Sequence, residues 1–214
     1  ASGKDVGLLD GDSGNSEVGH LTLGCGTILK QPFTLLEESI EDGSFDKIPL
    51  LIKKIKILKD TKKTLHLMGL LSDSSVHGSI KHLFAFLDVA KKQGIKKVVI
   101  HPFLDGRDVA PHTAEYYLEL LENKLKEIGI GKIGTIHGRF YAMDRNKNLD
   151  QTERSYRVLT CPQEESYPHW KEHVQVAYNS YTSEEFIPPF QLDKSSYIKK
   201  GDGIVFFNFR SDRA

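Results

Sequence analysis

The chain has 214 residues, of which 39% are hydrophobic and 27% are charged, as in an ordinary globular protein with room for one full α/β domain and a smaller remainder. Lysine plus arginine and aspartate plus glutamate balance at 29 each, so no overall charge would attract nucleic acid or an anionic membrane surface. No apolar run reaches the roughly 20 residues that a membrane span needs, and the first residues lack a signal-peptide core.

The two cysteines, Cys25 and Cys161, lie far apart and form no CxxC motif. They are too few for a disulfide framework, which fits a reducing compartment. We therefore expect two free thiols in a cytoplasmic protein that binds neither nucleic acid nor membranes.

The first 30 residues are rich in glycine and contain the motif GNSEVGH at residues 14–20. Ser16 lies between small or polar residues before an expected helix start, where backbone N–H groups favour a phosphate, so Ser16 could be a nucleophile. The simpler alternative is that Ser16 is an N-cap with Glu17 in the first helical turn, and helix propensity alone favours that interpretation.

Helical and strand-like segments follow in alternation. Residues 30–60 predict a helical pair, with Pro32 near a helix start and Gly43 at a stop. Further helices are predicted at residues 79–92, 113–128 and 150–159, and short apolar runs predict buried, mostly parallel strands at residues 64–71, 97–103, 132–137 and 203–209. Thr113 is an expected N-cap, and Asp150 and Glu153 have capping-box spacing. Residues 161–200 predict loops with short strands.

A polar cluster follows each expected strand, and parallel strands bring their carboxyl ends to one edge of a sheet. Five of the seven arginines fall in these loops, namely Arg107, Arg139, Arg145, Arg210 and Arg213. Because a guanidinium matches phosphate and carboxylate oxygens two at a time, this placement predicts an anion site. Asp105 and Gly106 are interpreted as a turn, His82 as structural, and Arg154 and Arg157 as surface residues of a helix.

Five segments resemble the cofactor-independent phosphoglycerate mutases in order and spacing. They are GNSEVGH at residues 14–20, LMGLLSD and the following VH within residues 67–77, FLDGRDV at residues 103–109, GRFYAMDR at residues 138–145 and FFNFRSDRA at residues 206–214. The resemblance runs nearly from end to end. Ser74 and Ser75 stand where the family usually has glycines, and Ser79 stands where it usually has histidine, all beside His77.

The resemblance implies an isomerase, a 2,3-bisphosphoglycerate-independent phosphoglycerate mutase of the alkaline phosphatase superfamily. Such enzymes interconvert 3-phosphoglycerate and 2-phosphoglycerate in glycolysis through a phosphoserine intermediate. Ser16 matches the nucleophile, which is also a metal ligand, and Asp108 matches the residue that manages the proton of the substrate hydroxyl. The implied substrate-binding residues are His77, Arg107, Asp108, Arg139, Arg145, Arg210 and Arg213. Beside Arg107, Asp108 would stay ionised and could act as a base.

The expected fold is α/β, with a mostly parallel sheet flanked by helices in a phosphotransferase domain at residues 31–214 that is incomplete at its C-terminus. Residues 1–30 would be a short piece of a second, phosphatase-like α/β domain that carries the nucleophile motif and a hinge. The family binds two manganese ions (Mn²⁺), mostly through residues that have no counterpart here. We expect a monomeric internal piece that is inactive alone.

Two other functions remain open. The chain could be a non-catalytic module that senses a phosphorylated metabolite through its arginine loops, or a phosphatase-like hydrolase of the same superfamily. Metal-ligand segments in the native chain would argue against the first, and net release of phosphate would indicate the second.

Overall fold

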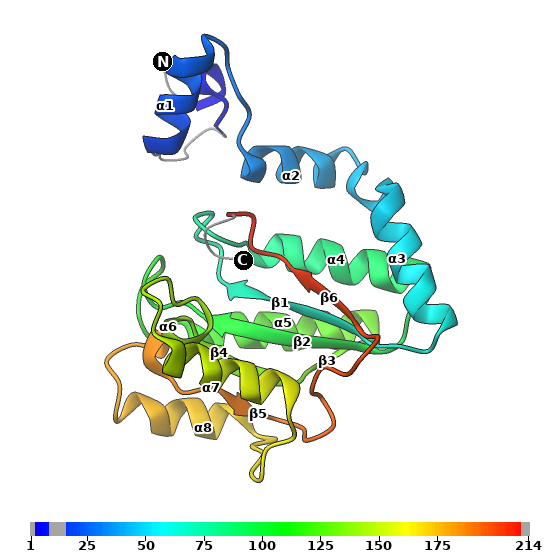
Figure 1. The fold of residues 1–214 in the computed structure, drawn as a ribbon, viewed down its shortest axis with the longest axis vertical. Helices are drawn as coiled ribbons and strands as arrows, with labels where there is room; N and C mark the ends of the chain where they lie inside the picture. Colours follow the sequence, from blue (N-terminus) through cyan, green and yellow to red (C-terminus); the bar gives the residue numbers. More distant parts are fainter. Residues whose placement is uncertain (1–2, 9–15, 211–214) are drawn as a thin grey trace. The chain divides into compact units, whose positions relative to one another are not determined.

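The computed structural model divides the chain into two compact units, residues 1–48 and residues 49–214 (Figure 1). It describes residues 3–8 and 16–210, apart from the side chains of residues 4 and 16–18. The sequence placed the functional boundary near residue 30, whereas the compact units meet between Ile48 and Pro49. The assignment of the two domains by function stays a prediction.

The first unit is helical in its described part. Its elements are η1 (Gly3–Val6), α1 (Ser16–Cys25), α2 (Pro32–Glu41) and η2 (Phe45–Lys47). Pro32 is the first residue of α2, and Gly43 takes a φ of +71° beyond its end, which confirms the predicted start and stop. Thr34 Oγ1 donates a hydrogen bond to the carbonyl of Gly7 (3.1 Å), which ties α2 to the segment after η1.

The second unit is built on a six-stranded sheet in which β5, β4, β2, β1 and β6 lie in that order and β3 pairs with β2. Its strands are β1 (Leu65–Leu71), β2 (Val98–Leu104), β3 (Lys132–Ile133), β4 (Thr135–Gly138), β5 (Phe190–Gln191) and β6 (Gly203–Phe206). Its helices are α3 (Pro49–Asp60), α4 (Ile80–Gln93), α5 (Ala114–Ile128), α6 (Arg139–Ala142), α7 (Leu149–Thr160), α8 (Trp170–Tyr178) and η3 (Glu184–Phe186). Every strand pair is parallel except β4 with β5, which confirms the mostly parallel sheet.

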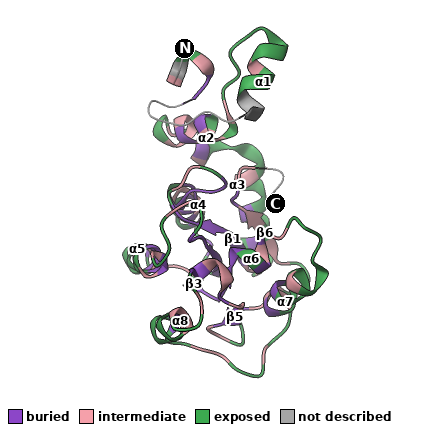
Figure 2. Cartoon of the chain, turned by 90° about the vertical axis from the view of Figure 1, so that its left-hand side faces the viewer, coloured by how far each residue is buried: buried purple, intermediate pink, exposed green. Residues whose placement is uncertain are grey.

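Helices cover both faces of this sheet. Figure 2 shows α4 and α5 on one face and α6 and α7 on the other, with the buried strands between them. All seven residues of β1 and all seven of β2 are buried, as near-continuous apolar runs in a parallel sheet predict. Met68, Leu70, Phe103 and Met143 form a core cluster under α6 and α7. The two central strands therefore form a rigid support for the loops that follow them.

The helix ends follow the sequence in several places. Ser79 is the N-cap of α4 and accepts a hydrogen bond from the backbone N–H of Lys81 (3.3 Å). Gly94 and Gly129 end α4 and α5 in the left-handed conformation, with a φ of +73° at each.

The predicted start of α7 was wrong, and that of α5 was confirmed in position but not in its side-chain cap. Asp150 lies inside α7, whose N-cap is Asn148, and Glu153 pairs with Arg157 one turn further on instead of forming a capping box. Thr113 occupies the N-cap position of α5, but its hydroxyl donates to Ala110 O (2.8 Å) and caps no N–H group.

Three segments also differ from the predicted strands and loops. The expected strand at residues 132–137 is split at Gly134 into β3 and β4, and β6 ends at Phe206. Residues 161–200, predicted as loops with short strands, contain the helix α8, whose Trp170 and Val174 are buried.

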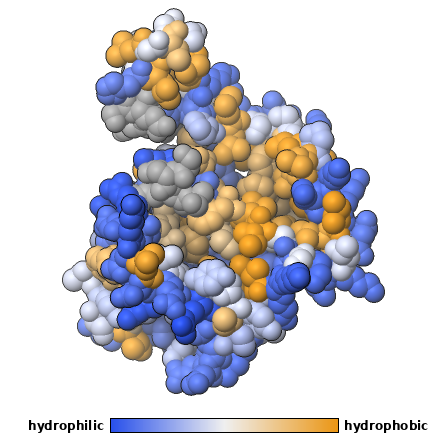
Figure 3. All heavy atoms as spheres, in the orientation of Figure 1, coloured by the Kyte–Doolittle hydropathy of each residue, from blue (hydrophilic) through white to orange (hydrophobic). Residues whose placement is uncertain are grey.

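Apolar side chains gather on one surface of the second unit. Figure 3 shows them over β6 and α3, where Ile204, Ile57 and Leu50 are exposed. Because β6 is an edge strand, this area combines unpaired backbone groups with exposed aliphatic groups. Among the described residues, no helix combines the length and apolar character needed to cross a membrane.

Three buried histidines form a continuous chain of hydrogen bonds across one face of the sheet. The chain starts at Asp202, before β6, and ends at Ser155 on α7. Its distances are 3.3 Å from Asp202 Oδ2 to His66 Nε2, 2.8 Å from His66 Nδ1 to His101 Nε2, 2.7 Å from His101 Nδ1 to Thr135 Oγ1, 2.7 Å from Thr135 Oγ1 to His137 Nε2 and 3.2 Å from His137 Nδ1 to Ser155 Oγ. This chain connects three neighbouring strands, β1, β2 and β4, with the residue before β6 and with α7 through side chains alone.

One assignment of protons satisfies every link of this chain. An ionised Asp202 can only accept, so His66 donates from Nε2 and must accept at Nδ1. The same reasoning makes His101 and His137 donate from Nε2 and accept at Nδ1, with Ser155 as the terminal donor. All three histidines are then neutral and share one tautomer, which suits a buried position because a charged imidazole would be poorly solvated there.

We predict that stability falls as the pH drops below about 6.5, the ordinary histidine pKa. Burial lowers the pKa of His66, lowers that of His101 well below its ordinary value and lowers that of His137 to about 3. The unfolded chain therefore binds more protons below pH 6.5, and a histidine that stays neutral in the folded protein reduces the free energy of unfolding by up to about 1.4 kcal/mol per pH unit there. Above pH 6.5 this contribution to stability is fully present.

Chemical denaturation at pH 7.5, 6.5 and 5.5 measures this slope, in a range where carboxylates contribute little because they titrate near pH 4 when unfolded. His137→Gln should reduce the slope, whereas His169→Gln, at an exposed position, should leave it unchanged. A free energy of unfolding that stays constant over this range would contradict the neutral, buried assignment.

A second prediction concerns Ser75, in the loop between β1 and α4. Its φ is +52°, in the left-handed region that favours glycine. Ser75→Gly should relieve about 1 kcal/mol of backbone strain, partly offset by greater freedom of the unfolded chain, for a net gain of up to about 1 kcal/mol in the free energy of unfolding.

Ser74→Gly is the matched control. Ser74 does not have a positive φ, and its hydroxyl lies 3.1 Å from Ser72 Oγ, to which it donates because the single proton of Ser72 goes to Asp105, so this change should destabilise the protein. Equal effects of the two substitutions in thermal or chemical unfolding would show that the backbone of Ser75 is not strained.

Candidate functional site

The carboxylate of Asp105 joins the loops that follow three strands. Asp105 comes directly after β2 and is only 2% exposed. It accepts hydrogen bonds from Ser72 Oγ, after β1 (2.7 Å), and from Arg139 Nη1, after β4 (2.5 Å). The prediction that the strands bring their polar clusters to one edge of the sheet is therefore confirmed for these three loops.

Asp105 also shapes its own loop. Its Oδ1 accepts from the backbone N–H of Arg107 (3.2 Å) and of Asp108 (2.9 Å). Gly106 lies between them with a φ of +65°, so the predicted turn is present. The interpretation of Asp105 as only a turn residue was nevertheless wrong, because its carboxylate holds the neighbouring loops as well.

Arg139 is buried between two carboxylates. It begins α6, is 6% exposed, and donates from Nη1 to Asp105 Oδ1 and to Asp108 Oδ2 (2.7 Å). Burial alone would lower the pKa of this guanidinium, but the hydrogen bond to Asp108 and the charges of both aspartates raise it above its ordinary value. Both bonds use Nη1, so the guanidinium has further N–H groups to offer to an anion.

Asp108 has partners other than the one expected from the sequence. The sequence suggested that Arg107 keeps Asp108 ionised, but Asp108 Oδ2 pairs with Arg139 and lies 3.5 Å from His77 Nε2. Arg107 is exposed, and its charge acts on Glu185, where it opposes the rise in pKa that burial causes. Asp108 thus stands between a fixed cation and a buried imidazole.

His77 brings the end of the fourth predicted strand to the same place. Its backbone carbonyl accepts from Phe209 N (2.9 Å), so the segment that leads to Arg210 runs beside the loop of His77. That loop is held further by Tyr117, whose hydroxyl donates to Asp73 Oδ1 (2.5 Å).

The structure brings together only part of the predicted site. His77, Asp108 and Arg139 are in contact, whereas Arg145 is exposed in the loop between α6 and α7 and has no hydrogen bond or ion pair with them among the described residues. The side chain of Ser16 and all of Arg213 lie outside the described part of the chain. Arg154 and Arg157 are exposed on α7, as predicted.

Three residues of the site were not predicted as site residues from the sequence, namely Ser72, Asp105 and Glu185. Ser72 and Asp105 each directly follow a buried strand, which is a signal that the sequence contains. Glu185 has no such signal, because it follows no predicted strand and reaches the arginines through the irregular segment after α8.

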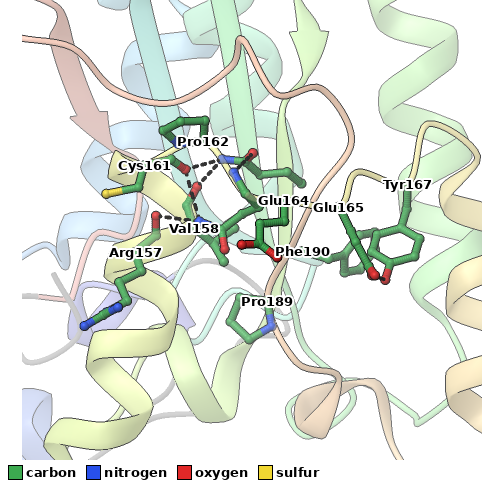
Figure 4. A pocket seen from close by; sticks show the side chains of 11 residues that line it. Arg157, Val158, Cys161, Pro162, Glu164, Glu165, Tyr167, Pro189 and Phe190 are labelled. Carbon is green, nitrogen blue, oxygen red and sulfur yellow. Dashed lines mark hydrogen bonds between the residues drawn. The ribbon is translucent and has the colours of Figure 1, made fainter.

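A separate hollow of about 620 Å³ lies where α7 ends beside β5 (Figure 4). The Gln191 side chain at its floor is fully engaged: its Nε2 donates to Val158 O (2.7 Å) and Cys161 O (2.8 Å), and its Oε1 accepts from Gln163 N (3.0 Å). Arg157, the one arginine that lines the hollow, pairs with Glu153. The polar groups of this hollow thus serve the fold, and the loops around Asp105 are the better candidate site.

Among the residues that the structure describes, no group of three or more histidine, cysteine, aspartate or glutamate side chains could hold a metal ion. The predicted metal ligand, Ser16, has an undescribed side chain, although α1 begins at Ser16 as the expected helix start requires. The described residues therefore contain no candidate metal centre.

Comparison with known proteins matches this arrangement to one family. The family model described as the N-terminus of BPG-independent PGAM (iPGM_N) matches residues 36–214. The 2,3-bisphosphoglycerate-independent phosphoglycerate mutases of Staphylococcus epidermidis and Staphylococcus aureus are 46% and 45% identical over 215 aligned positions, which take in all of this chain and 43% of each relative. The chain thus spans less than half the length of these relatives.

A solved structure agrees. The crystal structure of Leishmania mexicana phosphoglycerate mutase at low cobalt concentration superimposes with a TM-score of 0.88 and 30% identity, over 100% of this chain and 41% of the other. Since the family model covers most of the residues and the fold is shared, the chain belongs to the BPG-independent phosphoglycerate mutase family.

Proposed function

We propose that this chain supplies the substrate-binding loops and the nucleophilic serine of an enzyme that interconverts 3-phosphoglycerate and 2-phosphoglycerate through a phosphoserine. The observation that carries the proposal is the cluster of His77, Asp105, Asp108 and Arg139 at the carboxyl edge of the sheet. The mutase names of the relatives add weight. Because the chain spans less than half of those relatives, the activity belongs to the longer protein.

The substrate has a carboxylate and a phosphate of roughly −1.5 to −2 charge, so it needs several cationic donors. Two aspartates already offset the charge of Arg139. Net attraction would therefore come from Arg107, Arg145, Arg210 and Arg213. Arg139 and His77 would provide hydrogen-bond donors that their contacts with Asp108 hold in fixed positions. This division gives those four arginines the task of binding and the buried Arg139 the task of alignment.

Asp108 is the proposed proton acceptor. Moving the phosphoryl group between the two hydroxyls of glycerate requires that one hydroxyl lose its proton as it attacks and that the other gain one as it leaves. A carboxylate that contacts both Arg139 and His77 can hold that proton in transit without leaving its place in the site. Ser16 would carry the phosphoryl group meanwhile.

We also propose that the longer enzyme uses Mn²⁺, which would act as a Lewis acid at the phosphoryl group. The described residues do not assemble a metal site, so the step at Asp108 is derived without a metal. The remaining proposals are a role in glycolysis, a cytoplasmic location and a monomeric state. The exposed free thiols of Cys25 and Cys161 and the balanced charge support the cytoplasmic proposal.

A phosphatase-like hydrolase would share this site but would pass the phosphoryl group to water. The pairing of Asp108 with Arg139 and His77 favours a mutase, because a base fixed beside the glycerate-binding arginines is needed for return of the phosphoryl group and not for its loss to water. Formation of 2-phosphoglycerate without release of phosphate distinguishes the two reactions.

We predict that the chain binds 3-phosphoglycerate at low salt and that Arg107→Ala weakens this binding by about 10-fold to 100-fold. A hydrogen bond between charged groups contributes about 1.5–3 kcal/mol, and Arg107 is exposed, so its removal should not disturb the core. Titration calorimetry measures the change directly.

Arg154→Ala is the matched control, since Arg154 is an exposed arginine on α7 outside the cluster. It removes the same charge and should leave the affinity nearly unchanged. Equal losses of affinity in both variants would show that the effect comes from overall charge and not from the position of Arg107. If the folded chain gives no heat of binding, these loops do not suffice to hold the substrate.

A further inference from the structure

Residues 183–187, between α8 and β5, pack against two arginine loops that are far away in the sequence. One is the loop after β2, which carries Arg107 and Asp108, and the other is the turn after β4, which carries Arg139. Ser183 and Glu184 are buried, with exposures of 5% and 1%, although both are polar. Buried polar side chains of this kind require partners, and here the partners lie in the arginine loops.

Glu184 binds the far end of the loop after β2. Its Oε2 accepts from His112 N (2.7 Å), and its Oε1 accepts from Thr113 N (2.9 Å). These N–H groups precede and open α5, where the helix dipole favours a negative charge. Glu184 therefore binds, from 71 residues away, the N-cap N–H group that a glutamate inside the helix would bind in a capping box.

Ser183 binds the near end of the same loop. Its Oγ donates to Gly106 O (3.0 Å) and accepts from Glu185 N (3.3 Å). A Cβ atom on Gly106 would lie 2.3 Å from Ser183 Oγ and 2.7 Å from Glu184 Oε2, so no side chain fits between loop and segment. Arg107 and Asp108 are thus bracketed by two points of contact with residues 183 and 184.

The same segment continues to the turn after β4. Gly138 N donates to Ile187 O (3.0 Å), and a Cβ atom on Gly138 would lie 2.4 Å from Glu185 O. The rings of Phe140 and Phe186 meet edge to face with centroids 5.2 Å apart. One short segment therefore fixes both loops against each other.

We propose that Glu184 is a positioning residue, which holds the loop of Arg107 and Asp108 in the geometry that the substrate requires; this inference rests on the proposed function. Asp105 fixes only residues 107 and 108 of the loop, while the later part includes His112 in the left-handed region with a φ of +66°. Such a conformation persists only where its surroundings impose it; Glu184 accepts from the backbone N–H of His112, while the His112 ring bonds Thr182 O (3.2 Å) and stacks on Tyr178.

Without the carboxylate, the N–H groups of His112 and Thr113 lose their acceptor, and the loop can relax away from Arg139. A small displacement of an orienting group is costly to substrate binding. Glu184→Ala should therefore weaken 3-phosphoglycerate binding by about tenfold or more. Glu184→Gln keeps one acceptor oxygen and should lose less.

The test combines two measurements on the 214-residue chain. Calorimetry gives the affinity for 3-phosphoglycerate, and amide hydrogen exchange of the free protein gives the protection of Arg107, Asp108, His112 and Thr113. Ile55→Val, a mildly destabilising change in the core at α3, is the control for a general loss of stability. If Glu184 only stabilised the fold, Ile55→Val and Glu184→Gln would change the affinity and the amide exchange to the same extent.

The proposal is supported if Glu184→Ala loses more affinity than Glu184→Gln and both variants exchange faster at Arg107 and Asp108. Ile55→Val should keep the parental affinity and the parental protection. It is overturned if Glu184→Ala retains the parental affinity or the parental protection at Arg107 and Asp108. Should the parent bind no 3-phosphoglycerate, the proposed function has failed in this chain, and exchange at Arg107 and Asp108 alone decides whether Glu184 holds the loop.

Discussion

The arrangement of the site depends on one buried carboxylate. Asp105 is 2% exposed, and a polar group at that depth is costly to bury unless hydrogen-bond donors surround it. Its donors are the hydroxyl of Ser72, the guanidinium of Arg139 and the N–H groups of Arg107 and Asp108, drawn from the loops after three strands. Satisfying this single group therefore brings the loops together and sets where Arg139 and Asp108 meet.

The sheet beneath the loops separates neutral from charged polar groups. Inside it, the chain from Ser155 to Asp202 uses neutral histidines in one tautomer, so it links strands without burying cations. At the carboxyl edge, by contrast, Arg139 is buried against two aspartates, and Arg107 remains exposed. Such an edge can offer exposed cations to an anion while its buried charges stay matched.

The strands and the helix ends at Ser79, Gly94 and Gly129 were predictable, because continuous apolar runs, N-cap chemistry and left-handed glycines act locally. Arginines placed after strands likewise pointed to the edge of the sheet where Arg139 meets Asp105 and Asp108. Three features were out of reach: the pairing of Asp108 with Arg139, the capping of α5 by Glu184 and the helix α8. Each depends on contacts between distant parts of the chain, which spacing in a single sequence does not encode.

A mutase needs a site that retains glycerate while its phosphoryl group is away, and in the proposed function the donors fixed around Asp105 lie beside Asp108 as the carboxylate base. The most direct test of this account is a crystal structure of the chain with 3-phosphoglycerate. The account predicts that the ligand contacts Arg107 and Arg139 while the bonds of Asp105 stay in place. A ligand bound in the hollow beside Cys161, or one that displaces Arg139 from Asp105, would contradict it.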